Sequence, residues 1–197
     1  MYYKLGIDDP NKLFFTSDTH FSHFNICRYC HRPFASRSEM DHTLIENWNS
    51  VVPEDGIVVH CGDFMLNHKV DTTPYLKYMS KLNGKILLLR GNHDYIELCT
   101  KPQGNLIAVV DKAFINVDGV KIYAEHYPCV AFNGDYQVFG HIHTINDGTC
   151  YGIDGDVPSR LRKNQYDVGV DQNNYRPISY WELCDIFRNR ACEKGNK

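Results

Sequence analysis

The residues best suited to chemistry lie directly after short apolar runs. The run KILLLR at 85–90 is followed by Gly-Asn-His-Asp at 91–94, so an amide, an imidazole and a carboxylate end a predicted buried strand. Other runs also end in such groups, namely Asp18 and His20, Asp63, His126, and His141 with His143. Because ligands bind at the carboxyl ends of strands in open α/β sheets, we expect these groups to converge.

Each of these motifs is weak when it is taken alone. A Gly-Asp pair is a common turn, and a lone histidine after a strand is more often a surface or core residue than a ligand. The pairs Asp18-x-His20 and His141-x-His143 are stronger, since residues two apart on a strand point to the same face. Together the groups supply mixed nitrogen and oxygen ligands. Such a set suits two first-row transition ions and is too rich in imidazole for Mg²⁺ or Ca²⁺.

Strands and helices that could position these groups alternate along the first half of the chain. Predicted strands lie at 12–17, 56–61, 85–90, 120–125, 136–140 and 166–170, and predicted helices at 36–51, 71–84 and 179–191. Strand–helix–strand order over the first ~100 residues predicts a parallel α/β sheet. Beyond about residue 106, strands without long helices between them indicate hairpins or a second sheet. We expect a single domain over 1–197 and an exposed loop at 144–165.

Composition narrows the classes of protein. The net charge is −3, so any binding of nucleic acid would have to be local. No apolar run approaches the ~20 residues that span a bilayer, and no signal peptide precedes the first strand, so we expect a cytoplasmic location and no membrane partner. The eight cysteines are therefore expected as reduced thiols.

Two motifs suggest other functions. The stretch CRYCH at 27–31 matches c-type haem attachment or half of a zinc site. The absence of an export signal argues against haem and the lack of a second cysteine pair argues against zinc, so we interpret both cysteines as structural. The basic stretch SRLRKN at 159–164 lacks interleaved aromatic residues and is interpreted as a solvated loop rather than a nucleic-acid site.

Taken in order, the motifs Asp-x-His, Gly-Asp, Gly-Asn-His-Asp, His and Gly-His-x-His resemble those of the calcineurin-like metallophosphoesterases. The phrases FTSDTHFSHFNI, CHRPF and VGVDQNNYRPIS resemble a subgroup of small bacterial and phage phosphoesterases. One departure is Glu125 before His126, where many relatives have Gly or Ser. The resemblance implies a layered α/β sandwich of two mixed β-sheets flanked by helices, with the active site at the strand C-terminal ends.

The resemblance also implies a dinuclear metal-dependent phosphoesterase that acts by attack of a metal-bridging hydroxide. Its metals would be Mn, Fe, Zn or Ni. Its substrate would be a phosphate ester of the phosphodiester or nucleotide type, either a small molecule or a nucleic-acid end. The implied ligands are Asp18, His20 and His143 for one metal, Asn92, His126 and His141 for the other, with Asp63 as the bridge. His93 would be the general acid that protonates the leaving group.

Several neighbouring residues keep two interpretations. His23 and Asn25 either contact the substrate phosphate or are polar residues of a solvated loop. Arg32 could pair with phosphate, whereas Arg90 is expected in a surface salt bridge. Asp94 could orient His93 or cap a following helix.

A rival function is a retired scaffold that keeps the metal-binding fold for protein interaction. Such a scaffold would be expected to have lost His93 or several ligands, and all of them are present. A cytochrome-like electron carrier is a distant third.

Overall fold

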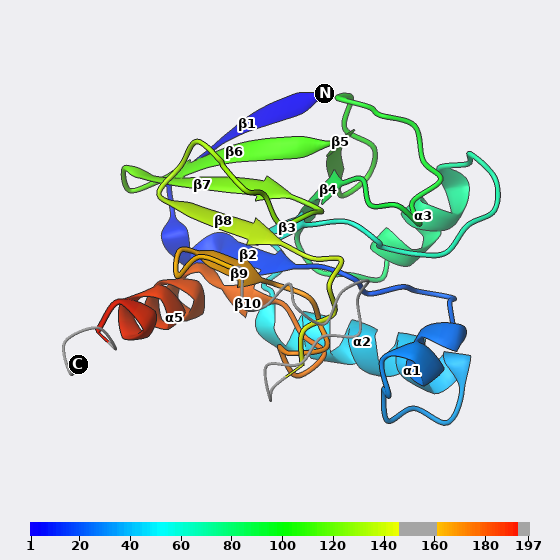
Figure 1. The fold of residues 1–197 in the computed structure, drawn as a ribbon. Helices are drawn as coiled ribbons and strands as arrows, with labels where there is room; N and C mark the ends of the chain where they lie inside the picture. Colours follow the sequence, from blue (N-terminus) through cyan, green and yellow to red (C-terminus); the bar gives the residue numbers. More distant parts are fainter. Residues whose placement is uncertain (146–160, 193–197) are drawn as a thin grey trace.

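Two five-stranded sheets form the centre of the computed structural model, which describes residues 1–145 and 161–192 (Figure 1). Sheet A has the strand order β1 (Tyr2–Ile7), β6 (Lys112–Val117), β7 (Val120–Glu125), β8 (Tyr136–Phe139) and β9 (Gln165–Asp167). Sheet B has the order β10 (Ile178–Ser179), β2 (Leu13–Thr16), β3 (Ile57–His60), β4 (Lys85–Leu89) and β5 (Leu106–Val110). The helices are η1 (Pro10–Lys12), α1 (Asn25–Tyr29), α2 (Arg37–Val51), α3 (Thr73–Met79) and α5 (Tyr180–Cys192).

Sheet B is the parallel sheet that the alternation predicts. Strands β2 to β5 run parallel, with a register shift between β4 and β5 at Ile86 and Leu87. Helices α2 and α3 cross over between β2 and β3 and between β3 and β4. Only the short strand β10 is antiparallel, at the edge beside β2. The carboxyl ends of β2, β3 and β4 therefore meet at one edge of the sheet, where their polar motifs begin.

Sheet A confirms the second sheet expected after residue 106. Strands β6 and β7 form an antiparallel hairpin, while β1, β8 and β9 pair parallel to their neighbours. The sequence patterns did not reveal β1, β5 or β6. The last predicted strand, 166–170, begins one residue earlier as β9 and continues past Asp167 only through a bridge between Ser17 and Gly169.

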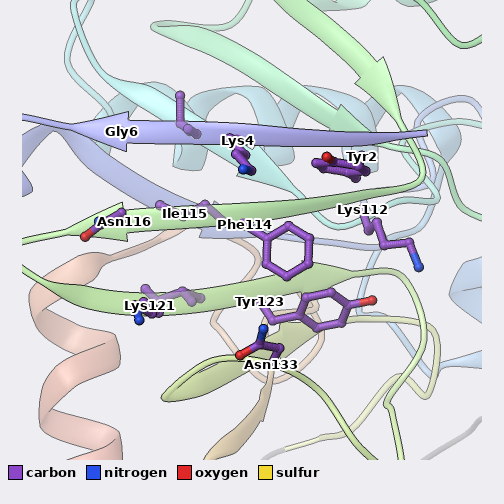
Figure 2. A pocket seen from close by; sticks show the side chains of 12 residues that line it. Tyr2, Lys4, Gly6, Lys112, Phe114, Ile115, Asn116, Lys121, Tyr123 and Asn133 are labelled. Atoms are coloured by element: carbon purple, nitrogen blue, oxygen red, sulfur yellow. The ribbon is translucent and has the colours of Figure 1, made fainter.

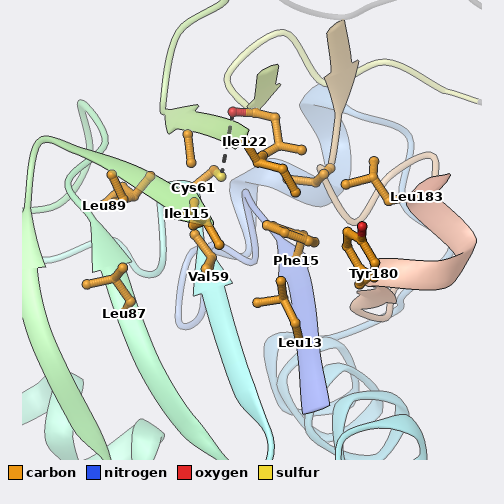
Figure 3. Close-up of a cluster of buried hydrophobic side chains, with 14 of the residues drawn as sticks. Leu13, Phe15, Val59, Cys61, Leu87, Leu89, Ile115, Ile122, Tyr180 and Leu183 are labelled. Atoms are coloured by element: carbon orange, nitrogen blue, oxygen red, sulfur yellow. Dashed lines mark hydrogen bonds between the residues drawn. The ribbon is translucent and has the colours of Figure 1, made fainter. Parts of the chain in front are cut away.

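The space between the sheets is filled by alternate residues of every central strand. Leu13 and Phe15 of β2 face sheet A, whereas Phe14 faces the helices. In the same way Leu87 and Leu89 of β4 lie in the core between the sheets, which Figure 3 shows together with Ile115 and Ile122 from sheet A. Both faces of sheet B are thus buried, which explains why its strands read as continuous apolar runs.

The three predicted helices form as α2, α3 and α5, with small differences in their bounds. Helix α2 buries Met40, Leu44 and Trp48, and the Ser36 side chain caps it by accepting from the Glu39 amide at 3.1 Å. Helix α5 begins with a capping box, in which the Ser179 amide donates to Oε2 of Glu182 and the Glu182 amide donates to Oγ of Ser179. The N-cap residue of helix α3, Thr72, makes no capping hydrogen bond with its side chain, and Oδ1 of Asp71 accepts from the Thr73 amide at 2.8 Å.

Some predicted segments lie outside the part of the chain that the structure describes. These include most of the loop 144–165 and the first two residues of the basic stretch 159–164. Within residues 1–145 and 161–192, no helix is both long enough and apolar enough to cross a membrane.

Candidate metal centre

The predicted ligands come together from both sheets in two groups. The first group contains Asp18 and His20, which follow β2, and His143, which follows β8; their ligand atoms lie within 4.8 Å of one another. We call it the inner group, because all three residues are buried.

The second group contains Asp63, His126 and His141, whose ligand atoms also lie within 4.8 Å of one another. Asn92 belongs with them, since its Oδ1 lies 2.9 Å from Nε2 of His126 and 2.9 Å from Nδ1 of His141. Asn92 is exposed and His141 is half-buried, so we call this the outer group.

Asp63 stands between the two groups. Its Oδ2 lies 3.6 Å from Nε2 of His20 in the inner group and 3.5 Å from Nε2 of His126 in the outer group. Its other oxygen, Oδ1, accepts a hydrogen bond from the His93 amide at 2.8 Å, which fixes the carboxylate in this position. One carboxylate oxygen therefore faces ligand atoms of both groups.

The backbone is strained at most of these residues. Five of the seven predicted ligands have a positive φ, between 49° and 73°, although none is glycine: Asp18, His20, Asp63, His141 and His143. A left-handed conformation costs a non-glycine residue of the order of 1–3 kcal/mol and concentrates at functional sites. Half of the ten described non-glycine residues with a positive φ are therefore predicted ligands.

Two glycines in the motifs let the loops approach closely. A Cβ atom at Gly91 would overlap the carboxylate and the amide of Asp63. A Cβ atom at Gly140 would overlap Ser17 and the carboxylate of Asp18. Both glycines are therefore required for packing, because each stands against a carboxylate of the site.

The inner group is supported by a buried ion pair. Nδ1 of His143 lies 2.8 Å from Oδ2 of Asp171, so the other ring nitrogen is turned toward Asp18 at 3.8 Å. Arg32 in turn contacts both oxygens of Asp171, at 2.8 and 3.0 Å, and donates to the carbonyls of Asp18 and Thr19 at 2.6 and 3.1 Å.

This arrangement differs from the expectation that Arg32 contacts the substrate phosphate. The Arg32 side chain is buried and its donors are directed at Asp171 and at the strained turn. The charge of Asp171 and the loop carbonyls satisfy it, so we assign it a positioning role. Arg90 forms the surface salt bridge that was expected, with Asp111 at 3.0 Å.

Neutral groups support the outer group. Nδ1 of His126 lies 2.8 Å from the carbonyl of Cys61, which leaves Nε2 to face Asp63 and Asn92. Asp94 takes neither of its two proposed roles. Its Oδ1 accepts from the amide of Phe64 and its Oδ2 from the amide of Gly91, so it joins the loops after β3 and β4. Burial raises the pKa of Asp94 to about 7.

A buried atom without a partner supports the fit of these residues to metal ions. Nε2 of His20 is buried and makes no hydrogen bond within residues 1–145 and 161–192, yet it faces the carboxylates of Asp18 and Asp63 at 4.0 and 3.6 Å. Burial lowers the pKa of His20 well below its ordinary value, and that of His141 to about 4. These rings are therefore neutral and offer lone pairs, beside buried carboxylates that need a cation.

The pKa of His143 shifts in the opposite direction. Burial favours its neutral form, but the carboxylates of Asp18 and Asp171 outweigh burial and raise its pKa well above the ordinary value. In the protein without metal, His143 therefore tends to hold a proton, which supplies the positive charge beside the carboxylates of the inner group. A metal ion would compete with that proton for the same nitrogen.

His93 and His23 lie at the open side of the inner group. The His93 ring is 5.3 Å from the ring of His20 and 5.8 Å from that of His23, and it makes no side-chain hydrogen bond to the residues that the structure describes. Nδ1 of His23 is 3.3 Å from Nδ1 of His20, and burial lowers the pKa of His23 to about 4. Asn25 is exposed at the first residue of α1.

Sequence reasoning missed two contributors near the inner group. Asp171 lies in the stretch VGVDQNNYRPIS, but nothing in its local pattern marks it as the partner of His143. Cys30 of the CRYCH stretch is buried, and its sulfur lies within 4.8 Å of the ligand atoms of His143 and Asp171. Cys27 packs in the core of α1 and α2, with its sulfur 3.5 Å from that of Met40.

Comparison with known proteins agrees with this architecture. Residues 12–126 match the sequence profile of the family described as calcineurin-like phosphoesterase. An uncharacterized protein of Methanocaldococcus jannaschii is 32% identical over 171 residues, which cover 85% of this chain and 86% of that protein. The crystal structure of a protein of unknown function from Aquifex aeolicus shares the fold, with a TM-score of 0.63 and 24% identity over 88% of this chain and 98% of that one.

A layered α/β fold with two carboxylate and histidine groups at its strand ends defines a metallophosphoesterase domain. The chain belongs to the calcineurin-like phosphoesterase family. The matched segment ends at His126 and does not reach the last motif, which the structure brings to the site from the end of β8. Membership supports a metal-dependent hydrolase that acts on phosphate esters.

Proposed function

We propose that this protein is a dinuclear metal-dependent phosphodiesterase that acts on diester or nucleotide-type substrates. The observation that supports it most strongly is the position of Asp63, whose single Oδ2 atom faces imidazole nitrogens of both ligand groups. Asp18, His20 and His143 would hold one metal, and Asn92, His126 and His141 the other. Two ions held in this way supply Lewis acidity and activate water for in-line attack on phosphorus.

The residues of the chain then have distinct tasks. Asp63 would offset the repulsion between two dications, because its carboxylate faces ligand atoms of both groups. Asp171 and Cys61 each hold a histidine through Nδ1, so that Nε2 points into the site. The strained loops keep these positions in the absence of substrate, which lowers the cost of ordering them on binding.

His93 is proposed as the general acid for the leaving group. Its backbone amide is fixed by Asp63, while its ring stands free of side-chain hydrogen bonds among the described residues and beside His20. It follows Asn92 directly, so the two side chains point in different directions. A proton on this ring can reach a leaving oxygen that departs from the inner group.

The open side of the site favours an ester with a planar group. Tyr127 is 45% exposed, and its ring lies 4.5 Å from that of His141. A nucleobase or an aryl group bound there could stack on this ring while its phosphate occupies the outer group. We therefore place diesters and nucleotides ahead of small aliphatic monoesters.

A metal-reconstitution experiment tests this function. The purified protein is stripped with a chelator, loaded in turn with Mn²⁺, Fe²⁺, Ni²⁺ or Zn²⁺, and assayed with bis(p-nitrophenyl) phosphate, cyclic nucleotides and monoesters. We expect hydrolysis with at least one metal at a stoichiometry of two ions for each chain. A stoichiometry of two ions without hydrolysis of any substrate would favour the retired scaffold instead.

The variant His93→Ala tests the general acid. We expect it to keep both metals and to hydrolyse esters of poor leaving groups about 100-fold more slowly or worse, because general acid catalysis contributes 10²–10⁴-fold. Esters of p-nitrophenol need little protonation and should be slowed much less. Equal slowing of both kinds of ester, or loss of metal, would contradict this role.

A further inference from the structure

The outer face of sheet A carries a groove that the candidate metal centre does not use (Figure 2). Its volume is about 850 Å³. It lies over β1, β6 and β7, on the face of the sheet that points away from sheet B, and the inner face of the same strands contributes Ile115 and Ile122 to the core. No helix or strand of the described residues covers it.

The side chains of the groove form three rows across the strands. Residues i and i+2 of a strand point to the same face and are about 7 Å apart, and each row continues from one strand to its paired neighbour. Each row contains one lysine, and the rows are Tyr2–Lys112–Glu125, Lys4–Phe114–Tyr123 and Gly6–Asn116–Lys121, so that the first row ends in a carboxylate. Figure 2 shows the Phe114 ring in the middle of the three lysines.

The charge of the groove differs from that of the whole chain. The chain has 24 acidic and 21 basic residues, but the described residues that line the groove include three lysines and no carboxylate. The nearest carboxylates stand at its edge, where Glu125 pairs with Lys112 and Asp135 accepts from the Lys121 amide at 2.8 Å. None of Lys4, Lys112 and Lys121 forms a salt bridge with a residue in 1–145 or 161–192, and all three are exposed. They are therefore available to an anionic partner.

Aromatic rings lie between these lysines. Phe114 is half-buried and its ring packs edge-on with that of Tyr2, at 5.9 Å between centroids and an angle of 86°. On its other side it contacts the ring of Tyr123 at 5.2 Å. Phe114 is thus held from both sides, which leaves a fixed apolar ring at the floor of the groove.

We infer that this groove binds single-stranded nucleic acid. Proteins that bind single strands combine a positively charged groove along the backbone with aromatic side chains on which bases stack. The rows supply both, with one lysine at each step and a ring in the middle row. An acidic peptide would use the lysines but not the ring, and a second copy of the chain in a symmetric contact would oppose lysines to lysines.

The position of the groove relates it to the metal centre. Lys112 pairs across the sheet with Glu125, and His126 of the outer group is the next residue. The row Tyr2–Lys112 therefore lies at the end of the sheet from which the ligands project. A strand held in the groove would run toward the candidate metal centre, and this last step rests on the proposed function.

Binding is tested with the chelator-stripped protein, so that hydrolysis cannot interfere. Fluorescence anisotropy is measured with labelled oligothymidylate and oligouridylate of about 15 nucleotides over a range of salt concentrations. For the variant Lys4→Gln/Lys112→Gln/Lys121→Gln we expect weaker binding and a plot of log affinity against log salt that is less steep by about 2, since each phosphate contact contributes about 0.7. The matched control is Lys77→Gln/Lys81→Gln/Lys85→Gln, which removes three exposed lysines elsewhere and should bind like the wild type.

The variant Phe114→Leu separates nucleic acid from other anions. We expect about tenfold weaker binding with an unchanged salt dependence, because a leucine cannot stack a base. Thermal melting of each variant shows whether it is folded. Absence of binding by the wild type at low salt, equal losses in both triple variants, or an unaffected Phe114→Leu variant would each overturn the inference.

Hydrolysis provides a separate readout. With metals restored, we expect the groove variant to raise KM for an oligonucleotide and to leave the hydrolysis of bis(p-nitrophenyl) phosphate unchanged. Oligonucleotide binding without hydrolysis of either substrate would refute the proposed function and leave the groove assignment intact. Equal hydrolysis of the oligonucleotide by wild type and variant would count against the groove.

Discussion

The inner and outer ligand groups share Asp63 but differ in burial and in what supports them. In the inner group Asp18 and His20 are fully buried, and His143 is held by Asp171 and, through it, by Arg32. In the outer group Asn92 is exposed, and His126 is held by a neutral backbone carbonyl. The inner group is thus a buried network of charged side chains, and the outer group adds neutral ligands that are more open to solvent.

This difference predicts unequal metal binding. A carboxylate that accepts from a ligating histidine makes the ring a stronger ligand and fixes its orientation, and a carbonyl does so less strongly. Burial also slows exchange with solvent. We therefore expect the inner group to bind its metal more tightly, and the outer group to be the one that loses metal on dialysis and meets the substrate first.

The variant Asp63→Asn should have the largest effect, because it acts on both groups at once. We expect a loss of activity of more than about 100-fold, above the range typical of residues that only support ligands, and fewer than two bound metals. Metal analysis after dialysis, together with the rate on bis(p-nitrophenyl) phosphate, checks this. Two metals bound at wild-type affinity would show that Asp63 does not bridge.

The variant Asp171→Asn should weaken the inner group alone. It keeps an acceptor for His143 but removes the negative charge, so we expect about 10–100-fold weaker binding of the tighter metal. It also removes the charged partner of the buried Arg32, which keeps only its hydrogen bonds to neutral acceptors, and this costs up to about 3–5 kcal/mol of stability. The burial of Arg32 and the low pKa of Asp171, which Arg32 and His143 lower to about 2 against the effect of burial, indicate how strongly the two are coupled.

A double variant separates the two effects of Asp171. In Arg32→Met/Asp171→Asn no charge is left unpaired, so we expect the melting temperature to recover toward the wild type while the inner metal stays weakly bound. Recovery of metal binding along with stability would mean that the ion pair serves folding only. Metal titrations of the outer group serve as the internal reference in both variants.

The ion pair also shows where sequence reasoning ends. The ligands could be predicted, because each follows an apolar strand and parallel strands bring their ends to one edge. Arg32 and Asp171 are 139 positions apart and belong to no periodic pattern. A lone arginine in a loop is typical of a residue that contacts phosphate. Only the fold shows that the guanidinium group of Arg32 contacts the buried carboxylate of Asp171.

Other differences have similar causes. Strands β1 and β6 were missed because their outer faces carry lysine and aromatic residues, which break the apolar run that marked sheet B. The same composition formed the groove of Figure 2. Asp94 was interpreted through its neighbours in sequence, whereas its Oδ1 accepts from the amides of Phe64 and Met65, about 30 positions away. Contacts between loops are tertiary and leave no local signature.

The variant Asn92→Ala should affect the outer group alone and more mildly. Asn92 is exposed, so we expect the free energy of unfolding to change by no more than about 0.5 kcal/mol. The weaker of the two metals should bind less tightly, and excess metal should restore much of the activity. Calorimetric titration with metal resolves the two steps. A change confined to the tighter step would reverse the assignment of inner and outer groups.

The last prediction concerns His60, which contacts a loop of the inner group and the loop that carries Asp63. Its Nε2 lies 3.0 Å from the hydroxyl of Thr19, in the loop of the inner group, and its Nδ1 accepts from the amide of Gly62, beside Asp63. Burial lowers the pKa of His60 to about 3. Between the unfolded pKa of about 6.5 and pH 3, the unfolded chain therefore binds a proton that the folded chain excludes.

Stability must consequently fall as the pH drops through this window. Integrating the difference gives about 1.5 kcal/mol lost between pH 6.5 and pH 5 from this residue. The variant His60→Gln keeps a hydrogen-bonding group and removes this titration, so its free energy of unfolding should depend less on pH over the same interval. Urea denaturation of the chelator-stripped proteins at several pH values measures the difference, in which the titrations common to both proteins cancel. Because His60 touches the loops of both groups, any loosening should weaken both metals alike, unlike the variants at Asp171 and Asn92. Parallel pH profiles for the two proteins would show that His60 does not titrate on unfolding.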